Sequence, residues 1–178
     1  QIEALQARVE PQFLFNTLEQ VRNLHAVEPR RAGAMLDDLI GYLRAALPHL
    51  RESASTLGKE VELAQAYLRI LRARSGAYDT IAFELPDALR DAAMPPMVLL
   101  PLIDATGATT PPGAVHIATA EHASRLRIAV SGARDGPSAT SSAAWRVIRE
   151  RLHALYGDAA ALRVESAAAG EQAVMEIP

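Results

Sequence analysis

The stretch Glu10-Pro11-Gln12-Phe13-Leu14-Phe15-Asn16-Thr17-Leu18 lies within a run of apolar residues at helical spacing. The run covers residues 1–27 and is interrupted by Pro11, so we expect a helix that is kinked at this proline. Residues 28–31, Glu-Pro-Arg-Arg, are typical of the turn that follows. The apolar positions of the run are Ile2, Leu5, Val9, Phe13, Leu14, Leu18, Val21 and Leu24.

Two further helices are predicted from apolar residues that lie alternately four and three positions apart. Pro48 should bend or end the first of them. The other begins after Thr56, a suitable N-cap, and reaches about Arg74. Apolar stripes this narrow fit a bundle within one chain or a surface shared by two chains, and we favour the shared surface. The predicted dimer interface consists of Leu36, Ile40, Leu43 and Leu47.

The pattern changes after Ser75, where strands and helices begin to alternate. Helices on one face of a mixed sheet would form a two-layer α/β sandwich, and the fold class predicted for the whole chain is α+β. We expect a helical dimerisation module at residues 1–76 and an α/β domain at residues 77–178. Strands are predicted at residues 81–85, 115–120, 126–130, 162–166 and 173–177, and helices at residues 97–103 and 142–156.

The composition excludes several classes of function. The 178 residues are 49% hydrophobic, enough for a sizeable core, and the net charge of −3 provides no basic surface for nucleic acid. The chain contains no cysteine, so disulfides, thiolate metal sites and cysteine nucleophiles are excluded, and the five histidines lack metal-binding spacing. No apolar run reaches the ~18 residues that would span a bilayer. We expect a cytoplasmic fragment, with any membrane tether upstream of Gln1.

Residues 10–18 resemble the Pro-His-Phe-Leu-Phe-Asn box of LytS/YehU-type sensor histidine kinases. Further segments resemble the same family in the same order, so the similarity covers nearly the whole chain. It implies a helical dimerisation module followed by an ATPase domain of the histidine-kinase/gyrase/Hsp90 type. The further segments are Tyr42-Leu43-Arg44, the run from Leu57 to Arg74 with Glu60 and Tyr67-Leu68, residues 94–103, residues 149–157 and Met175-Glu176-Ile177-Pro178.

The resemblance places the phospho-acceptor position of the family at Gln12. An imidazole nitrogen has a free lone pair that attacks phosphorus, whereas the lone pair of a carboxamide nitrogen is delocalised into the carbonyl. Gln12 is therefore not expected to form a phosphorylated intermediate. His25 is thirteen residues away, on roughly the opposite helix face at ~100° per residue, and His49 lies beside Pro48. We expect both to be surface histidines.

The N box of the family holds Mg²⁺ through an asparagine, and a histidine follows it. In this chain the box aligns with Asp104 and Ala105, and the later histidine aligns with Thr109. Ala105 offers no side-chain oxygen to a hard cation. Asp104 keeps the carboxylate of the box, and the alternative is that this carboxylate only solvates the end of a helix. The adenine-binding aspartate falls on Gly132 or Arg134. A shift of one residue would recruit Asp135 instead, although Asp135-Gly136-Pro137 is also typical of a plain turn.

The glycine box aligns with Ser142-Ala143-Ala144-Trp145. Side chains at Ser142 and Ala144 occupy positions where the family needs glycine, so that backbone N–H groups approach the phosphates. The following asparagine is replaced by Val147. Trp145 either fills the vacated pocket or plays an ordinary packing role.

The resemblance thus implies that this chain keeps the pattern of the scaffold but replaces four reactive elements of the family. They are the acceptor, the metal ligand, the adenine-binding residue and the phosphate loop. Our leading hypothesis is a catalytically inactive, homodimeric pseudokinase in two-component signalling, with no ATP, Mg²⁺ or other metal bound. Its partner would be a response regulator of the LytTR type or an active sister kinase. Two alternatives remain: a kinase that binds ATP through atypical contacts and acts in trans, and a small-molecule sensor that uses the former nucleotide cleft.

Overall fold

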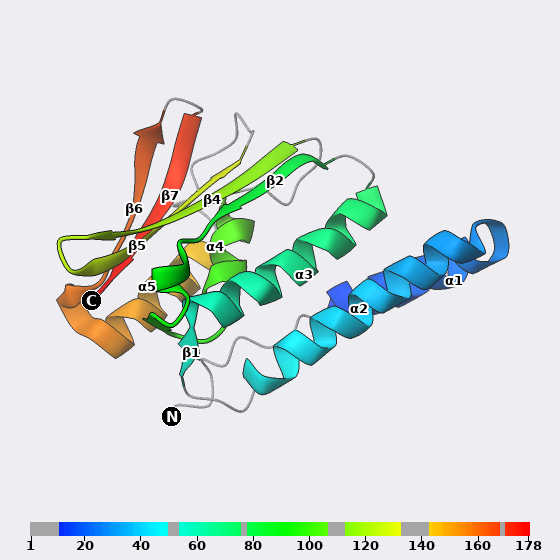
Figure 1. Cartoon of the computed structure of the whole chain (residues 1–178), viewed down its shortest axis with the longest axis horizontal. Coiled ribbons are helices and arrows are strands. Elements are labelled where there is room, and N and C mark those ends of the chain that lie inside the picture. Colours follow the sequence, from blue (N-terminus) through cyan, green and yellow to red (C-terminus); the bar gives the residue numbers. More distant parts are fainter. Residues whose placement is uncertain (1–10, 50–53, 76–77, 107–112, 133–142, 168–169) are drawn as a thin grey trace.

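The computed structural model describes residues 11–49, 54–75, 78–106, 113–132, 143–167 and 170–178 (Figure 1). The helices are α1 (Pro11–Val27), α2 (Pro29–His49), α3 (Leu57–Ser75), α4 (Leu99–Ala105) and α5 (Ala143–Tyr156), with short 3-10 turns at Asp87–Leu89 and Gly157–Ala159. The strands are β1 (Ser55–Thr56), β2 (Tyr78–Glu84), β3 (Ala93–Met94), β4 (Gly113–His122), β5 (Arg125–Gly132), β6 (Ala161–Ala167) and β7 (Gly170–Ile177).

Helices α1 and α2 form a hairpin that is joined through Glu28 alone (Figure 1). The turn predicted at residues 28–31 is therefore wrong beyond its first residue, because α2 already begins at Pro29. Proline suits the first position of a helix, where its missing N–H would have no partner within the helix. Helix α1 begins at Pro11, and the residues before it lie outside the described range. Pro48 is the penultimate residue of α2, and the residues after His49 lie outside the described range, so the helix end predicted at Pro48 stays a prediction.

Helix α3 lies between the α1–α2 hairpin and the sheet (Figure 1). The hydroxyl of Thr56 accepts a backbone N–H of the first turn at 3.4 Å, as predicted for its N-cap. At the other end, the carbonyl of Ala73 accepts a hydrogen bond from Nη2 of Arg31 at 3.1 Å. The carbonyl of Arg74 accepts one from Nε2 of Gln20, also at 3.1 Å. Helix-end carbonyls need partners from elsewhere, so α3 is fixed at its end by both α1 and α2.

Five strands form one sheet in the order β2-β4-β5-β7-β6. Strand β2 is parallel to β4, and every other neighbouring pair is antiparallel. The five predicted strands are all present, with ends that differ by a few residues. Strands β1 and β3 were not predicted; they form a separate two-stranded antiparallel ladder at the start of α3.

The helix predicted at residues 97–103 is shifted in the structure, where α4 covers Leu99–Ala105. Met97 has a φ of 56°, in the left-handed region, and therefore cannot be part of the helix. That conformation costs a non-glycine residue about 1–2 kcal/mol, so a compensating interaction is needed at this position.

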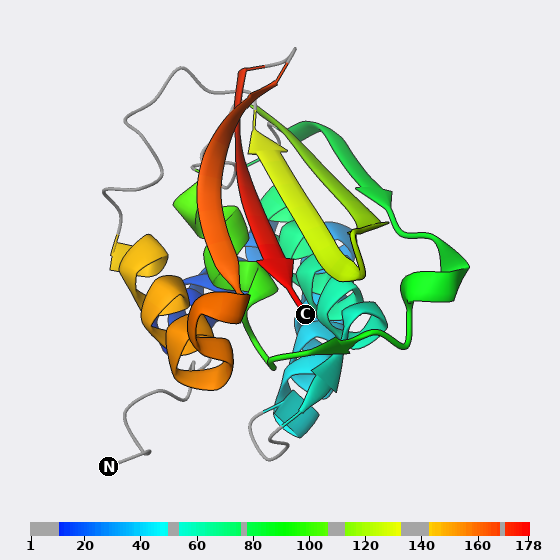
Figure 2. The same cartoon turned by 90° about the vertical axis from the view of Figure 1, so that its left-hand side faces the viewer.

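Helices α4 and α5 cover one face of the sheet, which confirms the predicted two-layer α+β arrangement (Figure 2). Alternate strand residues point toward these helices and form the core with them. In the described part of the chain, no helix is long and apolar enough to cross a membrane. The core side chains of the sheet and of α5 include Ile117, Ile128, Val130, Met175, Trp145, Ile148 and Leu152, each at most 3% exposed.

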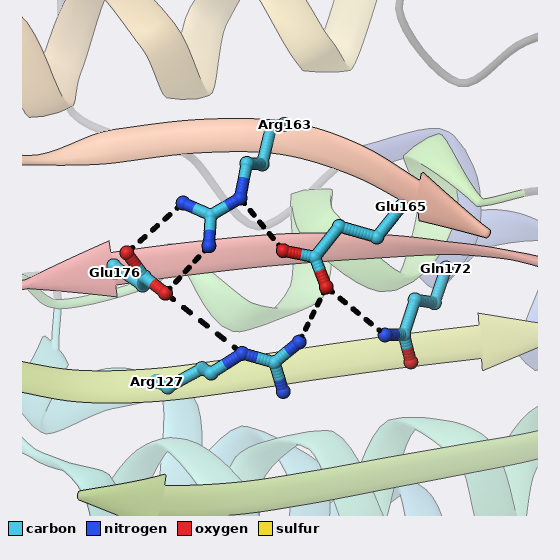
Figure 3. Close-up of polar contacts among 5 residues, drawn as sticks. All are labelled: Arg127, Arg163, Glu165, Gln172 and Glu176. Carbon is cyan, nitrogen blue, oxygen red and sulfur yellow. Dashed lines mark hydrogen bonds and ion pairs between the residues drawn. The ribbon is translucent and has the colours of Figure 1, made fainter. Parts of the chain in front are cut away.

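The other face of the sheet carries a network of charged side chains on β5, β6 and β7 (Figure 3). Arg163 donates to both carboxylate oxygens of Glu176, at 2.9 and 2.7 Å, and to Oε1 of Glu165 at 2.7 Å. Arg127 donates to Oε2 of Glu165 at 2.6 Å, and Gln172 joins the same oxygen at 3.4 Å. The hydrogen bonds from Arg163 hold the pKa of Glu165 and that of Glu176 below the ordinary value of 4.5.

This network should make the stability of the fold depend on acid pH. Because the pKa of Glu176 is lowered by folding, its contribution is complete above about pH 4.5 and is lost as the pH falls through the folded-state pKa. Glu176→Gln should lower the free energy of unfolding by about 1–2 kcal/mol near neutral pH. Urea unfolding at a series of pH values should show this deficit shrinking as the pH falls below about 4.5.

Glu150→Gln on the exposed face of α5 is the matched control and should change stability little at any pH. A deficit of Glu176→Gln that stays equally large in acid would contradict the role assigned to this carboxylate.

Candidate functional site

Gln12, at the predicted acceptor position, is the second residue of α1 and its side chain is exposed. Its Nε2 donates to Oδ1 of Asn16, one turn later, at 2.9 Å. Phe13, by contrast, is only 6% exposed, and the buried Thr17 donates to the Phe13 carbonyl at 2.7 Å. The box therefore turns its amide groups outward and inserts its first phenylalanine into the protein. His25 is exposed near the end of α1, about 20 Å along the helix from Gln12.

Phe13 is the centre of an aromatic cluster that links three helices. Its ring centroid lies 5.4 Å from that of Tyr42 on α2, edge-on, and 4.9 Å from that of Tyr67 on α3. The guanidinium carbon of Arg74 lies 5.9 Å from the centroid of the Phe13 ring. Aromatic pairs and cation–π contacts of this kind stabilise packing beyond the burial of apolar area. The acceptor box is thus anchored to both α2 and α3.

Glu60 of α3 is a fully buried carboxylate whose oxygens are held by backbone N–H groups. Oε1 accepts the N–H of Met97 at 2.8 Å, and Oε2 accepts those of Val98 and Leu99 at 3.1 and 3.4 Å. The left-handed backbone at Met97 turns these successive N–H groups toward one anion. Burial lowers the pKa of Arg151 on α5, and the negative charge of Glu60 opposes that shift. Helices α3, α4 and α5 therefore meet at this carboxylate.

The N-box positions Asp104 and Ala105 end helix α4 and differ in environment. Asp104 is exposed, and its Oδ1 accepts the hydroxyl of Tyr67 at 3.3 Å. Ala105 is 6% exposed and belongs to the hydrophobic core. At the position predicted for the metal-binding asparagine, the chain thus carries a buried methyl group. Thr109, the third predicted position of this box, lies outside the described residues.

The remaining nucleotide-box positions are described only in part. Gly132 is the last residue of β5 and pairs with Val115 of β4. Ala144 lies in the first turn of α5, half-buried against the core, and α5 packs beside α4 (Figure 2). Trp145 is 1% exposed and is part of that core. Outside the described residues lie Arg134, Asp135, Gly136 and Ser142.

The predicted dimer interface borders the buried face of α2, and Leu43 packs partly against the core. Leu36, Ile40 and Leu47 are 39%, 40% and 53% exposed, and Leu43 is half-buried. The α1–α2 hairpin thus leaves an apolar stripe in contact with water. The buried face of α2 consists of Ala32, Met35, Leu39, Tyr42 and Ala46, and α1 adds the exposed apolar residues Phe15, Leu18 and Val27.

Sequence reasoning assigned no role to Glu60, which the structure places at the junction of three helices. The available signal was its position beside Leu57, Val61 and Ala64, because an acid on the apolar stripe of a helix implies a buried partner. Its partners are backbone N–H groups, which no sequence pattern reveals. Within the described ranges, no three His, Asp or Glu side chains converge as a metal site.

Sequence comparisons agree with these features. The model of the histidine kinase family matches residues 1–78. The sensor protein LytS of Oceanobacillus iheyensis is 38% identical over 100 residues, which are 56% of this chain and 17% of that protein. The sensor histidine kinase/phosphatase LytS of Staphylococcus aureus is 31% identical over 104 residues, 58% of this chain and 18% of that protein. The matched segments thus span less than a fifth of these relatives.

Solved structures show the same fold. The catalytic domain of histidine kinase ThkA aligns with a TM-score of 0.54 and 15% identity, covering 70% of this chain and 94% of that domain. The histidine kinase domain of the blue-light activated kinase of Erythrobacter litoralis aligns with a TM-score of 0.52 and 16% identity, covering 92% of this chain and 93% of that domain. In its motifs the chain resembles sensor histidine kinases of the LytS type, its residues 1–78 match the histidine kinase family, and its fold is that of histidine kinase catalytic domains.

Proposed function

We propose that this chain is the core of a dimeric pseudokinase that signals in a two-component pathway by binding other proteins. The observation that carries the proposal is the residue at the acceptor position. Gln12 is exposed, as an acceptor must be, but presents a carboxamide that hydrogen-bonds to Asn16. Such a nitrogen has no free lone pair for attack on a γ-phosphate.

The described nucleotide-box residues support the same proposal. ATP with Mg²⁺ needs an oxygen ligand at the position of Ala105 and close backbone approach at that of Ala144. Ala105 has a buried methyl group there, and Ala144 carries a Cβ. Asp104 retains a carboxylate, which accepts the hydroxyl of Tyr67. These residues do not fit a metal–phosphate complex, so we assign no phosphoryl-transfer step to this chain.

Signalling would then depend on the surfaces of the helical hairpin. The exposed stripe on α1 and α2 favours a second copy of this chain as the first partner. A response regulator is a further partner, since histidine kinase ThkA, which has a similar fold at a TM-score of 0.50 and 12% identity, was crystallised in complex with the response regulator TrrA. We propose a regulator of the LytTR type or an active sister kinase for this role. In the full-length protein, a membrane tether would lie outside this segment.

Dimerisation should be lost when charge enters the apolar stripe. Leu47→Glu places a carboxylate on the stripe, and its burial against a second copy would be strongly unfavourable. Light scattering at micromolar concentration should show a dimer for the unmodified chain and a monomer, or a far weaker dimer, for the variant.

Leu155→Glu is the matched control for this experiment. Leu155 on α5 is 56% exposed, nearly the same as Leu47 at 53%, but it lies away from the hairpin. The control should remain dimeric. A clean monomer for the unmodified chain at high concentration, or equal loss of dimer in both variants, would contradict the proposed interface.

Restoring the acceptor alone should not restore activity. Gln12→His supplies a nucleophile on an exposed helix position, but the γ-phosphate must still be held in line and its charge neutralised. Incubation with labelled ATP should therefore give no acid-labile phosphate on the homodimer. Mixed with an active relative that forms heterodimers with it, the same variant should be labelled in trans.

Glu19→His is the control for this experiment, because it places an imidazole two turns further along the same exposed face of α1. It should stay unlabelled in both mixtures, and circular dichroism should confirm that both variants are folded. Labelling of the Gln12→His homodimer by itself would mean that the nucleotide site works.

A further inference from the structure

Three polar side chains of α3 lie seven residues apart and therefore on one face of the helix. They are Glu60, Tyr67 and Arg74, and successive members are rotated by only about 20° relative to each other. We call them the coupling face. Together they span most of α3, which runs between the hairpin and the sheet (Figure 1).

The two ends of the coupling face are held by different elements. Glu60 receives the three N–H groups at the start of α4, so the first turn of α3 is fixed to the α/β layer. At the last turn, Nε of Arg74 donates to Oε1 of Gln20 on α1 at 3.2 Å, and Nε2 of Gln20 donates back to the Arg74 carbonyl at 3.1 Å. The guanidinium of Arg74 also lies over the ring of Phe13.

Tyr67 lies between these two ends and contacts both α1 and α4. Its ring packs against Phe13, the residue next to the acceptor position, with centroids 4.9 Å apart. Its hydroxyl donates to Asp104 at the end of α4 over 3.3 Å. One side chain thus joins the acceptor box of α1 to the first N-box residue, although Phe13 and Asp104 are far apart in the sequence.

We propose that Tyr67 couples the packing of α1 to the conformation of α4, so that an event on the helical hairpin is transmitted to the ATPase-like domain. The contacts of Glu60 and Arg74 fix the two ends of α3, so that the helix stays in place. A change at Phe13 then moves the Tyr67 ring against fixed neighbours and draws its hydroxyl toward or away from Asp104. Packed aromatic clusters respond to such changes by adopting discrete alternative arrangements.

The coupling rests on the proposed function only in the assumption that a partner or a second copy acts on α1. It does not require ATP binding or phosphoryl transfer. Because coupling between two sites is reciprocal, a change at Asp104 should also alter α1.

Amide hydrogen exchange on the whole chain tests this proposal without any partner. Phe13→Leu should raise exchange in α4 several-fold, while amides of the central strand β5 serve as an internal reference. In a Tyr67→Phe background, which keeps the ring but removes the hydroxyl, Phe13→Leu should leave exchange in α4 unchanged. In the reverse direction, Asp104→Ala should raise exchange in the first turns of α1.

Tyr42→Phe is the matched control. Tyr42 also contacts Phe13, with ring centroids 5.4 Å apart, and this substitution removes the same hydroxyl oxygen as Tyr67→Phe does. In that background Phe13→Leu should still raise exchange in α4. If Tyr67→Phe proves too unstable, Asp104→Ala replaces it as the uncoupled background, since Asp104 is exposed. Equal effects of Phe13→Leu on α4 with and without the Tyr67 hydroxyl, or no effect in the unmodified chain, would overturn the coupling and leave the pseudokinase proposal untouched.

Discussion

The carboxylate of Glu60 fixes the arrangement on which the rest of this structure depends. It is fully buried and would be strongly unfavourable without partners, but it accepts the N–H groups of Met97, Val98 and Leu99. The same bonds stabilise the left-handed backbone of Met97 and set the residue at which α4 begins. Because α4 packs beside α5 on the sheet, one side chain of the third helix positions the whole helical layer of the α/β domain.

Scaffold and chemistry are separable in this chain. The aromatic cluster around Phe13, the anchored ends of α3 and the sheet core are all present in this chain. Under the proposed alignment with the family, Gln12 and Ala105 stand where an active kinase has its acceptor histidine and its metal-binding asparagine. A protein that keeps the arrangement and lacks the reactive groups is suited to transmit a conformational change or occupy a partner.

Local patterns predicted most of the fold, and non-local contacts account for what they missed. Alternation located the five strands, and four-three spacing located α2, α3 and the exposed stripe that includes Leu47. The start of α4 was misplaced because a carboxylate 37 residues earlier dictates the backbone at Met97. The site was located through motif positions, but the link from Phe13 through Tyr67 to Asp104 joins three helices and has no signature in any one of them.

Nucleotide affinity is the property that separates a pseudokinase from a kinase with an unusual site. Titration calorimetry of the intact chain with ATP and Mg²⁺, up to millimolar ligand, should give no saturable heat. The proposal places Ala105, which has no side-chain oxygen, at the metal-binding position, and Ala144, which has a Cβ, at a glycine position of the phosphate loop. Saturable binding with a dissociation constant below ~100 μM, equivalent to about 5.5 kcal/mol, would contradict the account.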